Sequence, residues 1–193
     1  MAFGFLRVAL TVVWRRSWLF VMLNWLFFGF IVVGALLVQV GVVQVYAWPF
    51  GVVLPVEVVN PLLLVCLIFV FNLVLSGFFV VTLTGFAFFG LSLFFLSLRA
   101  LLWGMLLNGL STPMFLAVLP TLILEGEGYV LAASVGVVFG LSWLKPDWVY
   151  GGEGLSRSEA AKRSLRECAL VYILVALVLF AAAVVETVTL VYI

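Results

Sequence analysis

The chain has 193 residues, of which 67% are hydrophobic and 9% are charged, and its formal net charge is +1. A soluble domain needs roughly a quarter of its residues charged to keep its surface hydrated, so this composition excludes a soluble globular protein. It indicates an integral membrane protein. At about 20 residues per transmembrane helix, the length allows five or six spans in one domain, residues 1–193, with no separate soluble domain.

The apolar stretches predict helices. Strands of a membrane β-barrel alternate apolar and polar side chains, whereas residues 62–71 and 171–185 are apolar on every side. We therefore expect an all-α polytopic membrane protein with about five transmembrane helices, one of them broken, and an amino-terminal interfacial helix.

The first elements in chain order are the interfacial helix and one span. Apolar residues recur at helical spacing among the arginines of residues 3–16, which is typical of a helix lying at the membrane surface. The first span is predicted at residues 17–46. Residues 47–61 hold three prolines and no Lys or Arg, which indicates a loop. Asn60 followed by Pro61 is a helix-start signal.

The middle of the chain predicts three crossings. The second span is expected at residues 62–88 and the third at 91–111, with a turn near Gly90. Thr112 and Pro113 repeat the cap-then-proline signal and open a fourth span that ends at residue 144. Two glycines and two carboxylates at residues 125–128 predict a break within it, because glycine lowers helix propensity by roughly 1 kcal/mol.

The last helix is predicted to begin near Ser156, which has capping-box spacing to Glu159. A basic segment then leads into a final span at about residues 168–193. Lys and Arg number three before the first span, none in residues 47–61 and five in residues 145–167. By the positive-inside rule, this distribution predicts a cell-membrane protein with a cytoplasmic amino terminus and an external carboxyl terminus.

The sequence offers little catalytic chemistry. It contains no histidine, which removes the commonest general base and the commonest ligand for zinc or haem. The glycine-rich residues 151–154 lack the Lys-Ser/Thr of a phosphate loop, and Cys66 and Cys168 are too far apart in sequence to suggest a ligand pair. We predict no enzyme activity, no cofactor and no metal site.

Four charges in or beside apolar runs are the first functional candidates. Arg99, Glu125, Glu127 and Glu186 each cost roughly 2.5–3.5 kcal/mol at the centre of a membrane helix, so they are expected to pair, line a polar cavity or reach the interface. Arg99 either snorkels to the headgroups or pairs with a carboxylate, of which Glu125 is the favoured one. Glu125 and Glu127 either point into one cavity from an unwound turn or lie in a solvated re-entrant loop.

Two further sets of residues suggest contacts. Ala132, Gly136 and Gly140 form a stripe of small residues for close helix packing, either within the chain or at a dimer seam. Basic residues before the last span are expected to bind anionic lipid headgroups at roughly 1 kcal/mol per charge. These are Arg157, Lys162, Arg163 and Arg166. The expected partners are the lipid bilayer, a second copy of the chain and a membrane protein, and nucleic acid is not expected.

The pattern resembles the stage II sporulation protein M family of membrane proteins. The resemblance rests on residues 69–73 (Phe-Val-Phe-Asn-Leu), and on Leu119-Pro120 followed by Glu125 and a helix with Ala132-Ala133 and Gly136. It also rests on residues 163–167 and on residues 181–189, which end Glu-Thr-Val-Thr. Through this resemblance Asn72 joins Arg99, Glu125, Glu127 and Glu186 as a candidate intramembrane polar cluster.

The chain departs from the family pattern at three positions. Thr121 stands where the family usually has His, Phe71 replaces the first Asn and Leu190 replaces a closing Pro. A function that depends on that His is absent or altered. The resemblance implies a non-enzymatic membrane scaffold or remodelling component. A channel or transporter with a path lined by the intramembrane charges is the alternative, and a hydrated cavity reaching both faces would favour it.

Overall fold

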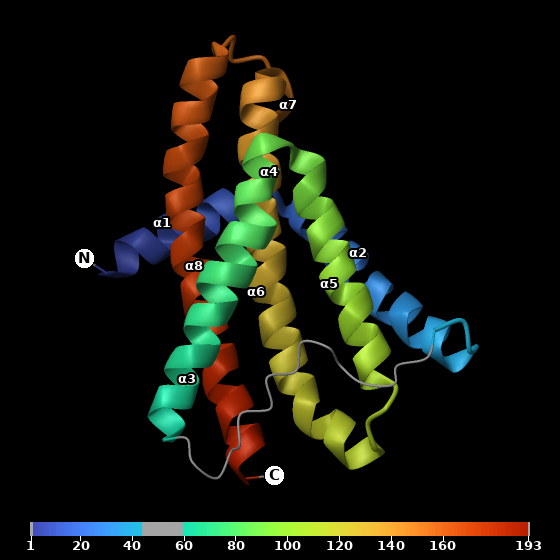
Figure 1. Ribbon diagram of the computed structural model, residues 1–193. Helices are drawn as coiled ribbons and strands as arrows, with labels where there is room; N and C mark the ends of the chain where they lie inside the picture. The colour runs from blue at the N-terminus through green and yellow to red at the C-terminus, as the bar shows by residue number, and fades with distance from the viewer. Residues whose placement is uncertain (1, 44–59, 193) are drawn as a thin grey trace.

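The computed structural model describes residues 2–43 and 60–192, and every regular element in them is a helix (Figure 1). Five helices within these described ranges are long and apolar enough to cross a membrane. The prediction of an all-α polytopic membrane protein is therefore confirmed. Nearly all of the predicted loop at residues 47–61 lies outside the described residues.

Helix α1 (Ala2–Arg15) packs against α8, and a bend at Arg16 leads into α2 (Ser17–Gln39). The buried side of α1 carries Ala9 and Val12, as expected for an amphipathic helix. α2 is the first span. It ends before the predicted residue 46, because Gly41 adopts a positive φ of 76° that terminates the helix.

The second span consists of three consecutive segments, α3 (Pro61–Val70), η2 (Phe71–Leu83) and α4 (Thr84–Ala87). It starts as predicted, because Asn60 Oδ1 accepts a hydrogen bond from the Leu62 amide at 2.9 Å. The η2 segment is a π-helix, a wider form that the sequence did not predict.

Extended backbone at Phe88 separates α4 from α5 (Phe89–Leu107), the third span. The turn between the second and third spans therefore falls at Phe88, slightly before the predicted Gly90.

Helix α6 (Thr112–Leu144) runs without interruption through Glu125 and Gly128, so the predicted break was wrong. The two glycines at the predicted break, Gly126 and Gly128, pack closely against neighbouring helices. A Cβ at Gly126 would overlap the Phe27 ring, and one at Gly128 would overlap the Leu179 side chain. Close contact with neighbouring helices on both sides favours the continuous helix over an unwound turn.

After α7 (Pro146–Tyr150), the last element is α8 (Arg157–Tyr192), a single 36-residue helix that joins the predicted basic segment to the last span. The capping box forms as predicted. The Ser156 amide donates to Glu159 Oε2 at 3.0 Å, and the Glu159 amide donates to Ser156 Oγ at 3.3 Å.

α6 lies at the centre of the molecule and packs most extensively on the antiparallel α8 (Figure 1). The stripe of Ala132, Gly136 and Gly140 lies within this core. Gly85 of α4 and Ser92 of α5 lie against Gly136. They approach so closely that a Cβ at Gly136 would overlap Ser92 Oγ. The stripe is therefore covered by the chain itself and is not a free dimer seam.

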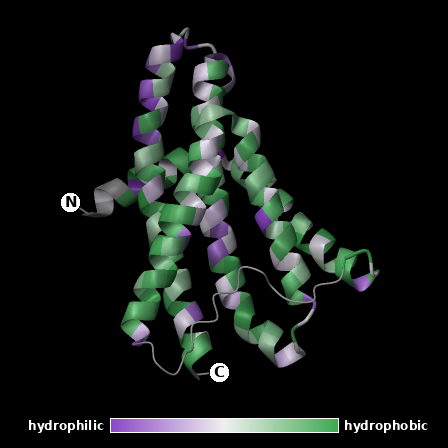
Figure 2. Ribbon diagram, in the orientation of Figure 1, coloured by the Kyte–Doolittle hydropathy of each residue, from purple (hydrophilic) through white to green (hydrophobic). Residues whose placement is uncertain are grey.

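Hydrophobic residues cover most of the lengths of the spans (Figure 2). Hydrophilic positions gather at the end of α8 that follows α7, and isolated ones occur within α5 and α6. The hydrophilic end of α8 coincides with the basic segment.

Candidate functional site

Arg99 of α5 lies in a polar cluster between helices. One guanidinium nitrogen donates to the Tyr129 hydroxyl at 2.6 Å and the other donates to Ser76 Oγ at 3.2 Å. The guanidinium carbon also lies 4.0 Å from the centre of the Tyr129 ring, a cation–π contact. The nearest Glu125 oxygen is 4.0 Å from Arg99. Arg99 is thus paired rather than extended toward the headgroups.

Hydrogen bonds extend from Tyr129 to Glu125 through Asn72. The Tyr129 hydroxyl donates to Asn72 Oδ1 at 2.8 Å, and Asn72 Nδ2 donates to Glu125 Oε1. All three residues are buried, and Glu125 is only 3% exposed. We call the set Arg99, Asn72, Ser76, Glu125 and Tyr129 the Arg99 network.

The local helix geometry explains how the Arg99 network assembles. Glu125 and Tyr129 are four residues apart in α6, so they share one face. Asn72 and Ser76 are both buried on η2. A Cβ at Gly77 would lie only 3.0 Å from the Asn72 carbonyl oxygen, so glycine suits the wider backbone at this point. The π-helix thus presents two polar side chains to α5 and α6.

Glu186 of α8 joins this site at Glu125. Its carboxyl lies within hydrogen-bonding range of the Glu125 carboxyl. The Oε2 atoms of both residues are buried and have no other hydrogen-bond partner. Of the five residues predicted to form the intramembrane cluster, the structure brings together Arg99, Glu125, Glu186 and Asn72.

Glu127 does not belong to the cluster, so its predicted membership was wrong. Its carboxylate lies 3.5 Å from Asn24 Nδ2 of α2, which also donates to the Phe20 carbonyl. In a regular helix two residues two positions apart diverge by about 200°. Because α6 stays helical, Glu125 and Glu127 point to different neighbours.

A second polar cluster surrounds Glu167 of α8, and the sequence did not predict it. Arg16, at the bend between α1 and α2, donates to Glu167 Oε2 at 2.6 Å. Arg163 Nε is 3.5 Å from Oε1, and the Tyr150 hydroxyl donates to Oε2 at 3.4 Å. Burial raises the pKa of the Tyr150 phenol, and the Glu167 charge adds to that rise. This Glu167 cluster ties α1 and α7 to α8.

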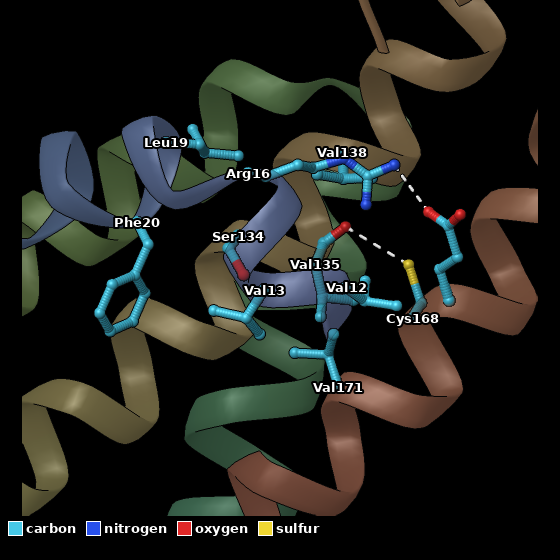
Figure 3. A pocket seen from close by; sticks show the side chains of 11 residues that line it. Val12, Val13, Arg16, Leu19, Phe20, Ser134, Val135, Val138, Cys168 and Val171 are labelled. Carbon is cyan, nitrogen blue, oxygen red and sulfur yellow. Dashed lines mark hydrogen bonds and ion pairs between the residues drawn. The ribbon is translucent and has the colours of Figure 1, made fainter. Parts of the chain in front are cut away.

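Beside the Glu167 cluster lies a small cavity between α1, the start of α2, α6 and α8. Arg16 extends along it, and Cys168 Sγ donates to the Val135 carbonyl at 3.7 Å (Figure 3). Its volume is about 20 Å³, enough for about one water molecule. Valines form much of its wall, so it is a packing space rather than a substrate site.

The basic residues of α8 separate into two groups. Arg157, Lys162 and Arg166 are exposed. Arg163 instead pairs with Glu153 and Glu167, and its guanidinium lies 4.7 Å from the centre of the Tyr150 ring. Arg163 therefore acts within the protein, whereas the other three are available to headgroups.

Two residues of the Arg99 network were missed from the sequence. Tyr129 is one helical turn after Glu125, a signal that could have found it. Ser76 offered none, because its role depends on the π-helical backbone.

These features define a multi-pass α-helical membrane protein with a buried polar cluster between its spans. Comparisons of the chain with protein-family models, with curated proteins and with solved structures give no match.

Proposed function

We propose that this protein is a non-enzymatic scaffold or remodelling component of the cell membrane, with its amino terminus in the cytoplasm and its carboxyl terminus outside. The observation that carries the proposal is the Arg99 network, in which charged and polar groups of η2, α5 and α6 are bonded to one another. Such bonds hold helices in fixed positions within lipid.

The burial of the Arg99 network favours a scaffold over a channel. A water-filled path is lined by polar groups that are exposed to the pore. Here Glu125 is 3% exposed and Tyr129 is 0% exposed. Their polarity is directed inward, toward other helices of the same chain.

The resemblance to the stage II sporulation protein M family supports the same proposal. Asn72 and Glu125, two residues that carry the resemblance, are hydrogen-bonded to each other. Thr121, at the position where the family usually has His, is buried one turn before Glu125.

The proposed partners are anionic lipids, a second copy of the chain and another membrane protein. Arg157, Lys162 and Arg166 supply exposed positive charge for lipid headgroups. Large apolar side chains on the outer faces of the spans, including Trp18 at 64% and Trp25 at 78% exposed, are compatible with lipid or with a neighbouring helix.

A flux assay with an assembly assay tests the proposal. The purified chain is placed in liposomes, and leakage of H⁺, K⁺ and Cl⁻ is followed with ion-sensitive dyes. In parallel, cross-linking in native membranes measures self-association. A scaffold is expected to give leakage equal to that of protein-free liposomes together with cross-linked oligomers. Protein-dependent flux that is lost in Arg99→Gln but kept in the control Glu127→Gln would overturn the proposal in favour of a channel or transporter.

A further inference from the structure

Five buried side-chain polar atoms have no hydrogen-bond partner in the part of the chain that the structure describes. They are Arg99 Nε, Thr121 Oγ1, Glu125 Oε2, Glu186 Oε2 and Thr187 Oγ1. Buried polar atoms are nearly always hydrogen-bonded, so the unpartnered Oε2 atoms of two neighbouring carboxyls, Glu125 and Glu186, indicate that a donor between them is missing.

The packing of α6 on α8 brings Glu186 close to Glu125. The two helices run antiparallel (Figure 1), and Thr189 Oγ1 donates to the Ala117 carbonyl at 3.4 Å. Thr121, one turn further along α6, therefore lies at about the level of Glu186 on α8. Glu125 follows on the same face of α6. Glu125 is 3% exposed, whereas Glu186 is only partly buried, so the α6 side of the pair lies deeper than the α8 side.

The two carboxyl groups require a positive charge between them. An ionised carboxylate has only acceptor atoms, so two of them cannot form a hydrogen bond with each other. Glu125 and Glu186 nevertheless face each other within hydrogen-bonding range. A shared proton supplies the missing donor, as in other paired carboxyls in protein interiors.

The balance of charge between Arg99 and the two carboxyls also indicates a bound proton. Arg99 contributes one positive charge to two carboxyls, which leaves one negative charge uncompensated in a medium where isolated charges are very unfavourable. The other polar groups of the Arg99 network are neutral or weakly acidic: Asn72 and Ser76 from η2 and Tyr129 from α6. α2 and α3 contain no Asp, Glu, Lys or Arg.

We propose that the Glu125–Glu186 pair is a proton-binding site, in which one proton is shared between the two carboxyls and Arg99 balances the remaining negative charge. Binding at this site joins α6 to α8. Loss of the proton places two adjacent carboxylates between these helices and weakens their packing.

Infrared spectroscopy of the full chain in lipid nanodiscs tests whether the proton is shared. The wild-type protein at neutral pH is expected to show a protonated-carboxyl band that shifts in D₂O. The same band is expected to disappear in Glu125→Gln and in Glu186→Gln, because either change removes one half of the pair. The matched control is Glu127→Gln on another side of α6, which should retain it. A band that survives both changes, or no such band in the wild type, would overturn the proposal.

Thermal unfolding gives an independent readout that also identifies the ligand. Above about pH 6 the unfolded chain has already released the protons of both carboxyls, whereas the folded chain still holds one. The Tm should therefore fall by several degrees as pH rises from about 6 to about 10. Glu186→Gln supplies a neutral donor, so its Tm should lose most of this pH dependence, while Glu127→Gln keeps it. If Glu125→Gln does not fold, the half-buried Glu186→Gln carries the test alone. An unchanged pH dependence in Glu186→Gln, or a Tm that rises with Na⁺ at constant pH, would contradict a proton as the ligand.

Discussion

At the scale of single residues, the unusual property of this protein is a charged side chain, Arg99, that has several polar partners inside an apolar structure. Arg99 donates to Tyr129 and to Ser76, stacks on the Tyr129 ring and lies near Glu125. Each contact offsets part of the cost of removing the guanidinium from water. Removing one partner would leave the others buried without compensation, which costs more than the absence of the whole pair.

Arg99→Leu and Glu125→Leu should each lower the stability of the protein in detergent, by about 3–5 kcal/mol if the remaining charge stays buried. The double variant should recover part of this loss, because neither Arg99 nor Glu125 is then buried without the other. Thermal unfolding of the three variants measures the coupling. Arg157→Leu, at an exposed position before the last span, serves as the control and should have little effect. Two single effects that simply add would show that Arg99 and Glu125 are not coupled.

The residues of this site could be predicted from the sequence only where their chemistry conflicts with lipid. Arg99, Glu125 and Glu186 stand out because charge in an apolar run demands a partner. Tyr129 and Ser76 do not stand out, since one hydroxyl in a membrane helix is common and each needs only one or two bonds. Glu167 lies at the edge of a basic segment, where a carboxylate is expected on the surface, so its buried role could not be read from spacing.

At the scale of helices, close approach is set by glycine. In the α2–α5 contact, a Cβ at Gly34 would overlap the Leu101 carbonyl oxygen, and one at Gly104 would overlap the Ile31 carbonyl oxygen. The contact is reciprocal, because each helix supplies a glycine to the backbone of the other. Asn108 Nδ2 adds a hydrogen bond to the Ala35 carbonyl at 2.8 Å. Backbone proximity of this kind drives helix association in lipid.

Gly104→Ala should therefore destabilise the protein by about 1–3 kcal/mol, the usual cost of adding a methyl group to a filled contact. Gly29→Ala is the matched control on α2, because a Cβ there meets nothing within 4 Å. This second change should be neutral or slightly stabilising, since alanine favours a helix over glycine. Thermal unfolding of both variants checks the difference, and equal stability would show that the α2–α5 contact tolerates a wider spacing.

The helices themselves were predictable because their apolar runs are long, and caps such as Asn60-Pro61 and Ser156 with Glu159 fixed their starts. The sequence predicted an irregular segment in α6, at residues 125–128, but the structure has it in the second span, as the π-helix η2. Local propensity favours unwinding at Gly126 and Gly128, but contacts with Phe27 and Leu179 depend on the tertiary structure. The π-helix of residues 71–83, in which Asn72 and Ser76 are buried, likewise has no signal in a one-dimensional pattern.

At the scale of the whole molecule, the Glu167 cluster connects the amino-terminal helix to the bundle. Glu167→Gln should weaken this connection, because Arg16 and Arg163 lose the carboxylate that compensates them. Hydrogen exchange of the α1 amides should become faster, while exchange in α6 stays slow. Arg166→Gln, an exposed position next to Glu167, should leave α1 unchanged. Unaltered exchange of α1 in Glu167→Gln would mean that apolar contacts alone hold it.

The five spans give the final prediction, which concerns topology. An odd number of crossings places the two ends of the chain on opposite sides, and the basic segments at residues 7–16 and 145–167 favour the cytoplasm for the amino terminus. In a Cys66→Ala background, Ser111→Cys between α5 and α6 should react with a membrane-impermeant maleimide added to intact cells. Ser158→Cys, near the start of α8, should react only after the membrane is permeabilised. Both positions are exposed and the remaining Cys168 is buried, so the labelling reports each site alone. If both positions react in intact cells, or if only Ser158→Cys reacts, this orientation is wrong. The basic residues of α8 would then not lie in the cytoplasm.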